Sequence, residues 1–209
     1  MVRQVKGRSS LSFVAAAALL LSAAQASAQA GAQAGPRVRI ITDAGAIVVV
    51  LEPAKAPITV ANFLRYVDEH RYDGGSFYRA VTLRNQLPSA QQPQIEVIQG
   101  GIDADTLKRL QSIPHETNDR SGIRHTDGVI SMARGAPGSA SSEFFIVIGE
   151  QPALDFGGKR NPDGQGFAAF GRVIKGMNVV RRIQQMQSAS QPPQRMTNPV
   201  RIRKVVRAP

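Results

Sequence analysis

The feature that most constrains this chain is a series of short segments rich in Val, Ile and Phe, separated by clusters of turn residues. Such segments are typical of strands, and the Gly, Asp and Pro clusters between them mark turns. We expect strands at residues 38–42, 46–51, 77–81, 95–99, 129–132, 144–148, 167–173 and 200–206. Closing a sheet into a barrel removes its edges. The expected fold is therefore mainly β, a closed antiparallel eight-stranded β-barrel.

Two segments have the periodicity of amphipathic helices instead. Residues 59–70 and 177–187 each repeat apolar side chains at a spacing of three and four residues. We expect these two helices to cap the ends of the barrel. The segments 83–93 and 188–198 are polar and contain prolines, so both are predicted to be surface loops.

The amino terminus has the pattern of a secretory signal peptide. Three basic residues precede an apolar run at 11–24, and small residues follow it. We assign residues 1–30 to the signal peptide, 31–36 to a flexible leader and 37–209 to one domain. The run is shorter than the roughly 20 residues of a spanning helix, so an uncleaved membrane anchor is the weaker alternative. In a bacterium this leader predicts a periplasmic protein without stable membrane insertion after cleavage.

The composition excludes several kinds of chemistry. The chain has no cysteine and only three histidines, so we expect no thiol catalysis and no metal site. The sequence also lacks nucleotide-binding and hydrolase motifs, and we expect no cofactor. The formal net charge of +11 could suit nucleic acid, and residues 166–170 loosely resemble an RNA-stacking strand. Export argues against that alternative, and we predict no nucleic-acid partner.

Six short motifs then occur in a fixed order along nearly the whole mature chain. They are Phe77-Tyr78-Arg79, Gln99-Gly100-Gly101, the six residues from Val129 to Arg134, the five residues from Ser142 to Ile146, Leu154-Asp155, and Phe170-Gly171-Arg172-Val173 followed by Gly176-Met177. Each motif is weakly specific by itself. In this order and spacing they resemble the cyclophilin family of peptidyl-prolyl cis-trans isomerases.

This resemblance implies rotation about X-Pro bonds in exported, folding proteins. The barrier of about 20 kcal/mol comes from amide resonance, so a catalyst need only stabilise the twisted amide. A fixed guanidinium can donate to the prolyl nitrogen, and the matched strand supplies Arg79. The resemblance implies catalytic roles for Arg79 and Gln99, and substrate contacts from Val97, Ala133, Arg134, Glu143, Phe145, Leu154 and Phe167. Partners would be proline-containing peptides, bound by a monomer.

Four departures from the family pattern bear on this interpretation. Glu96 stands where a pocket phenylalanine is common, Glu143 replaces a glutamine, and Ala153 stands where many eukaryotic members have tryptophan. The segment between Arg79 and Gln99 is also longer than usual for the family. A peptide-binding module without catalytic activity, built on the same barrel, is therefore the main alternative.

Overall fold

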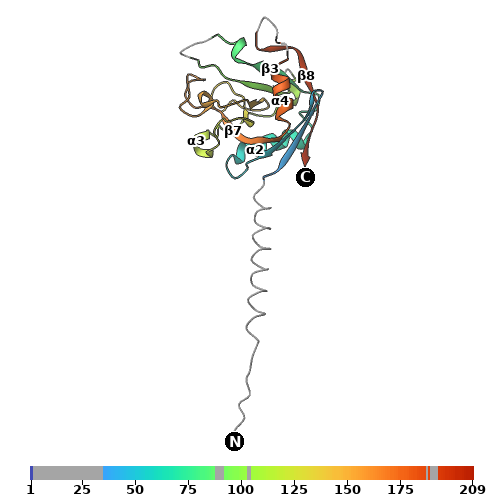
Figure 1. Cartoon of the computed structure of the whole chain (residues 1–209), viewed down its shortest axis with the longest axis vertical. Coiled ribbons are helices and arrows are strands. Elements are labelled where there is room, and N and C mark those ends of the chain that lie inside the picture. The colour runs from blue at the N-terminus through green and yellow to red at the C-terminus, as the bar shows by residue number, and fades with distance from the viewer. Residues whose placement is uncertain (2–34, 88–91, 103–104, 187, 189–192) are drawn as a thin grey trace. The chain divides into compact units, whose positions relative to one another are not determined.

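The computed structural model describes residues 1, 35–87, 92–102, 105–186, 188 and 193–209 (Figure 1). The predicted signal peptide and most of the leader lie outside these residues. The strands are β1 (Arg37–Thr42), β2 (Gly45–Leu51), β3 (Ser76–Val81), β4 (Val97–Gly101), β5 (Val129–Met132), β6 (Phe144–Val147), β7 (Ala168–Lys175) and β8 (Arg195–Ala208). The helices are α2 (Pro57–Asp68), α3 (Asn118–Ser121) and α4 (Met177–Gln184). No helix in these described ranges is long and apolar enough to cross a bilayer.

The strands form a closed barrel in the order β1-β2-β7-β5-β6-β4-β3-β8. Every pairing is antiparallel, and β8 pairs again with β1, so the first and last strands lie side by side (blue and red in Figure 1). The predicted eight-stranded antiparallel barrel is confirmed. Because the sheet closes on itself, no strand of the barrel leaves an edge unpaired.

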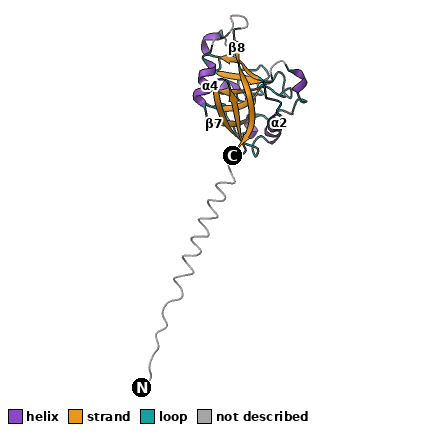
Figure 2. Cartoon of the chain, turned by 90° about the vertical axis from the view of Figure 1, so that its right-hand side faces the viewer, coloured by secondary structure: helices purple, strands orange, loops and turns teal. Residues whose placement is uncertain are grey.

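The barrel interior is filled by aromatic side chains that meet the apolar face of α2. Phe63 of α2 packs against Tyr72, Phe144 and Phe170, with ring centroids between 5.1 and 5.6 Å apart. All four residues have an exposed fraction of 0%. α2 packs against β7 and β8, while α4 packs against β2, β3 and β4, and Figure 2 shows the two helices on either side of the strands. Both helices were predicted, whereas the short α3 was not.

The beginning of β8 differs from the sequence prediction. Residues 195–198 were assigned to a loop, but they form the first part of this strand. Thr197, Asn198 and Pro199 resemble a turn in the sequence, which hid the strand. Met196 and Val200 are buried, the three residues between them are exposed, and the pairing with β3 shifts register in this stretch. The irregular pairing accommodates the proline.

The basic residues near the carboxyl terminus lie on the outer side of β8. Arg201, Arg203, Lys204 and Arg207 are exposed, while Ile202 and Val205 between them are buried. Arg203 forms an ion pair with Asp43, and Arg207 forms one with Asp68. The charges of this strand are therefore part of an ordinary solvent-facing surface.

Candidate active site

A row of paired residues crosses five strands at one level of the barrel. Arg79 of β3 pairs with Gln99 of β4, which pairs with Phe145 of β6. Phe145 also neighbours Ser131 of β5, which pairs with Ala169 of β7. Paired residues on adjacent strands point to the same face. The row therefore lies on the outer face, while Phe144, next to Phe145, points into the barrel.

A pocket of about 260 Å³ lies over this row. It brings together every predicted site residue except Glu143. Four further residues also line it that the sequence analysis did not identify. The complete lining is Arg79, Gln92, Ile95, Val97, Gln99, Ala133, Arg134, Phe145, Leu154, Arg160, Asn161 and Phe167.

The apolar part of the pocket is formed by Phe145, Phe167, Leu154 and Val97, all of them buried. The rings of Phe145 and Phe167 meet edge to face at 89°, with centroids 5.3 Å apart. Phe167 donates its backbone N–H to the carbonyl of Leu154 at 3.0 Å, which joins two walls of the pocket. Gly166 makes this approach possible, because its φ is +60° and a Cβ would lie 2.6 Å from backbone atoms.

Ile95, and not Glu96, lines the pocket at this end of β4. Because side chains alternate along an extended chain, Ile95 faces the pocket with Val97 and Gln99. Glu96 lies on the opposite face, where its carboxylate accepts a hydrogen bond from the Gln184 side chain at 3.1 Å. The negative charge of Glu96 is therefore kept out of the pocket.

The guanidinium of Arg79 is held from two sides. It donates from Nη1 to Oε1 of Gln99 at 2.7 Å, and from Nε to Oε1 of Gln194 at 3.0 Å. Its Nη2 also donates to Gln194. Gln99 in turn donates to the hydroxyl of Tyr78 at 2.8 Å. Burial lowers the pKa of Arg79 from its usual value, and the charge of Arg160 lowers it further.

Gln194 is a residue that the sequence did not reveal, and we expect it to position Arg79. Gln194→Met removes the acceptor shared by Nε and Nη2 while keeping the length of the side chain. The guanidinium should then lose its fixed orientation, and kcat should fall by about tenfold with little change in KM. Gln185→Met, at an exposed position of similar chemistry, is the control. Wild-type kcat in Gln194→Met would contradict a positioning role.

A buried histidine supports the aromatic platform from behind. The His125 ring lies against Phe145, with centroids 6.0 Å apart and planes inclined by 19°. Its Nδ1 lies 2.7 Å from Oδ1 of Asp155, and its Nε2 lies 3.0 Å from Oγ of Ser131. Burial opposes a low pKa for Asp155, but the hydrogen bonds from His125 outweigh it and the pKa is lowered. Ser131 is completely buried, so substrate cannot reach its hydroxyl, and the three residues have a structural role.

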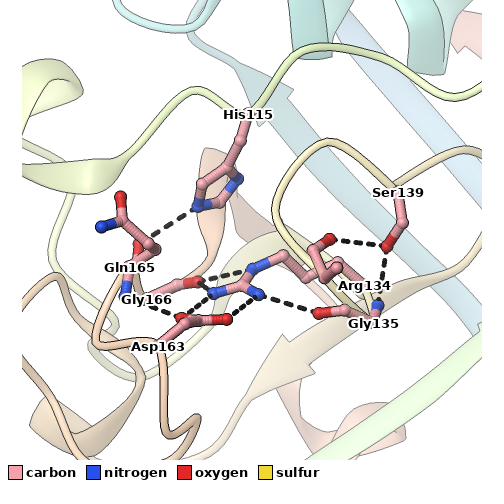
Figure 3. A network of polar contacts seen from close by, with 8 residues as sticks. His115, Arg134, Gly135, Ser139, Asp163, Gln165 and Gly166 are labelled. Carbon is pink, nitrogen blue, oxygen red and sulfur yellow. Dashed lines mark hydrogen bonds and ion pairs between the residues drawn. The ribbon is translucent and has the colours of Figure 1, made fainter.

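The side chain of Arg134 braces the pocket instead of pointing into solvent. Figure 3 shows its guanidinium between Asp163 and the carbonyls of Gly166 and Gly135. The Arg134 side chain is only 1% exposed, and its Cζ lies 5.2 Å from the centre of the Phe167 ring. Only the backbone of Arg134 is therefore available for the predicted peptide contact. Its side chain fixes the loop that carries Phe167.

The ion pair between Arg134 and Asp163 should make the stability of the loop that carries Phe167 depend on pH. The hydrogen bond from Arg134 is the main reason that the pKa of Asp163 is lowered from 3.8 to about 2. Because the folded value is the lower one, the stabilisation is complete above the unfolded pKa of about 3.9 and is lost as the pH falls through about 2. Asp163→Asn should therefore reduce the free energy of unfolding much less at pH 2 than at pH 7. An equal loss at both pH values would contradict this prediction.

Glu143 lies outside the pocket. Its carboxylate accepts a hydrogen bond from the Ser142 hydroxyl at 3.1 Å and packs against the backbone of Gly101. A peptide contact by Glu143 stays a prediction. Among the described residues, no group of three His, Asp or Glu side chains is placed to hold a metal ion.

The fold and the pocket define a class of protein: a closed barrel that presents an apolar pocket and a fixed guanidinium on its outer face. The sequence model of the family described as cyclophilin type peptidyl-prolyl cis-trans isomerase/CLD matches residues 37–207. The chain belongs to this family and is a peptidyl-prolyl cis-trans isomerase.

Curated relatives agree with this assignment, and a solved structure shares the fold. The chain is 33% identical to peptidyl-prolyl cis-trans isomerase A of Dickeya dadantii over 84% of its own length and 85% of the relative. It is 32% identical to peptidyl-prolyl cis-trans isomerase B of Escherichia coli, over 68% and 80% of the two chains. A crystal structure of a Cryptosporidium parvum cyclophilin type isomerase shares the fold, with a TM-score of 0.65 at 21% identity over 83% and 98% of the two chains. That protein was also crystallised in the presence of the dipeptide Ala-Pro.

Proposed function

We propose that Arg79 is the catalytic residue, and that it stabilises the twisted amide of an X-Pro bond in proline-containing peptides. Twisting the amide ends its resonance and localises the lone pair on the prolyl nitrogen, which becomes a hydrogen-bond acceptor. The observation that carries the proposal is the guanidinium held by Gln99 and Gln194 at the edge of an apolar pocket. A donor fixed before the reaction stabilises the transition state without the cost of reorientation.

The hydrogen-bond count of Arg79 supports this role. A guanidinium has five N–H groups. Contacts with the described residues occupy Nε, one N–H of Nη1 and one N–H of Nη2. With respect to the part of the chain that the structure describes, two N–H groups are left for a substrate. The nitrogen of a planar amide is a poor hydrogen-bond acceptor. These donors would therefore bind the twisted state more strongly than either planar isomer.

The pocket beside Arg79 suits a prolyl ring. Phe145, Phe167, Leu154 and Val97 offer apolar surface, and the edge-to-face rings leave a flat wall. We assign these four residues to proline binding. Ala133 and the backbone of Arg134 would contact the residues before proline, so that the ring is fixed while the acyl side rotates.

The isomerase proposal is tested with an exchange experiment on a short Ala-Pro peptide. Two-dimensional NMR exchange spectroscopy measures cis-trans rates directly, and the purified residues 37–209 should accelerate exchange well beyond the spontaneous rate of tens of seconds. Peptide binding without any acceleration would support the alternative of a non-catalytic binding module.

We also propose that the protein is exported to the periplasm and assists the folding of exported proteins there. The order of basic residues, apolar run and small residues at 1–30 supports this proposal. Expression of the full chain in a Gram-negative host, followed by fractionation and amino-terminal sequencing, tests it. We expect a periplasmic protein that begins after residue 28 or 30. Recovery of the full-length chain in the membrane fraction would support an uncleaved anchor instead.

A further inference from the structure

Besides Arg79 and Arg134, a third arginine, Arg160, lines the same pocket. Arg160 lies in the loop between Leu154 and Phe167, and it is half-buried. Its Nη1 donates to the carbonyl of Pro93 at 2.9 Å and to Oε1 of Gln86 at 3.3 Å. Its backbone N–H donates to the carbonyl of Ala153 at 3.0 Å. Arg160 is thus fixed beside Ala153, the residue that stands where many eukaryotic members of the family have tryptophan.

The positive charge of Arg160 is not neutralised by the described residues. Its hydrogen-bond acceptors are uncharged, and no described carboxylate lies within 4.0 Å of it. The acidic residues nearest in sequence are used elsewhere: Asp163 is paired with Arg134, and Asp155 with His125. Residues 88–91, which the structure does not describe, contain no Asp or Glu. Of the three arginines among the described residues that line the pocket, Arg134 is paired with Asp163, whereas Arg79 and Arg160 have no carboxylate partner there.

Burial lowers the pKa of both arginines from the usual value. A guanidinium nevertheless stays protonated at neutral pH, so both charges are present. Their mutual repulsion contributes to the lowered pKa of Arg79. An anion placed between them would be attracted by both, and the half-buried site would screen this attraction less than bulk water does.

The strand register shows on which side of the site Arg160 lies. Ala133 donates its backbone N–H to the carbonyl of Glu143, which precedes Phe144, the partner of Gly100. Ala133 therefore lies next to the row of paired residues, toward the end of β4 that contains Gly100. Arg160 instead contacts Pro93, which precedes Val97, the first residue of β4. Arg160 therefore lies toward the other end of this strand. Arg160 and Ala133 lie on opposite sides of the row that contains Arg79.

We propose that Arg160 is a specificity residue that favours peptides in which an acidic residue directly follows the proline. This inference rests on the proposed function, in which the residues before proline lie along Ala133. The chain after proline then leaves the pocket on the side of Arg160. A carboxylate on the first residue after proline can reach the remaining N–H groups of this guanidinium and form a charge-assisted hydrogen bond.

The test compares exchange catalysis on three amidated peptides, Ala-Ala-Pro-Glu, Ala-Ala-Pro-Gln and Ala-Ala-Pro-Lys, at low salt. Amidation leaves the side chain after proline as the only difference. We expect kcat/KM for the Glu peptide to be about fivefold higher than for the Gln peptide, which corresponds to about 1 kcal/mol. The Lys peptide should fall below the Gln peptide, and both differences should shrink at high salt.

Two variants separate Arg160 from the general positive charge of the protein. Arg160→Met should lower the Glu-to-Gln ratio to about 1, and Arg160→Lys should restore part of it. Lys159→Met removes the same charge from the adjacent, exposed position and should keep the ratio of the wild type. A ratio near 1 in the wild type, or a full ratio in Arg160→Met, overturns the inference. Absence of catalysis on all three peptides would instead contradict the proposed function.

Discussion

Replacement of Arg79 by alanine should lower kcat/KM for an Ala-Pro peptide by about 100-fold. Removal of one preorganised donor to a transition state typically costs a factor of 10² to 10³ in kcat. The two remaining N–H groups of Arg79 are the charged donors that we place next to the prolyl nitrogen, and Gln99 and Gln194 hold them there. The loss should appear mainly in kcat, because the apolar walls that bind the ring remain.

Two further variants sharpen this experiment. Arg79→Lys keeps the charge but lacks the planar fork, so it cannot contact Gln99, Gln194 and a substrate in one fixed geometry. We expect it to recover little of the lost rate. Arg172→Ala removes an exposed arginine from β7 and should leave the rate unchanged. If folded Arg79→Ala kept more than a third of the wild-type kcat/KM, Arg79 could not be the main catalytic group.

The barrel could be predicted from the sequence because its strands alternate or are continuously apolar. The six motifs also placed Arg79, Gln99 and Phe145 in a common site. The register between the strands could not be predicted from the sequence. Only the pairing of β3, β4 and β6 shows that these three residues form one row on the outer face. Register depends on contacts between segments that are far apart in the chain.

The residues that were missed lie in loops or support the site from behind. Gln194 follows two prolines, and Arg160 lies two residues after a pair of glycines. Both segments therefore carry turn signals without any periodicity that marks a function. Their side chains reach Arg79 and the pocket through tertiary contacts alone. His125 did have a signal, because it precedes the matched strand 129–134 and Asp155 belongs to a matched motif. A supporting role for His125 can be inferred from these motifs only once Ser131 and Phe145 are known to be neighbours.

The stability of the barrel should depend strongly on Phe63, although this residue is remote from the catalytic row. Phe63 is fully buried, and its ring contacts Tyr72, Phe144 and Phe170. Phe63→Ala removes the ring through which α2 fills the interior. Truncation of a buried Phe costs about 3 to 5 kcal/mol, because the loss of apolar burial adds to the cost of the cavity. This is a large part of the roughly 5 to 15 kcal/mol that stabilises a domain.

Urea denaturation and thermal unfolding of residues 37–209 would measure this loss, and the midpoint temperature should fall by roughly 10 °C. Phe156→Ala is the matched control, since Phe156 is 46% exposed and its truncation should change stability by less than about 0.5 kcal/mol. Phe63→Leu leaves a smaller cavity and should cost less than half as much, which keeps the comparison usable if Phe63→Ala does not fold. Equal losses in Phe63→Leu and Phe156→Ala would mean that α2 closes the barrel without depending on this ring.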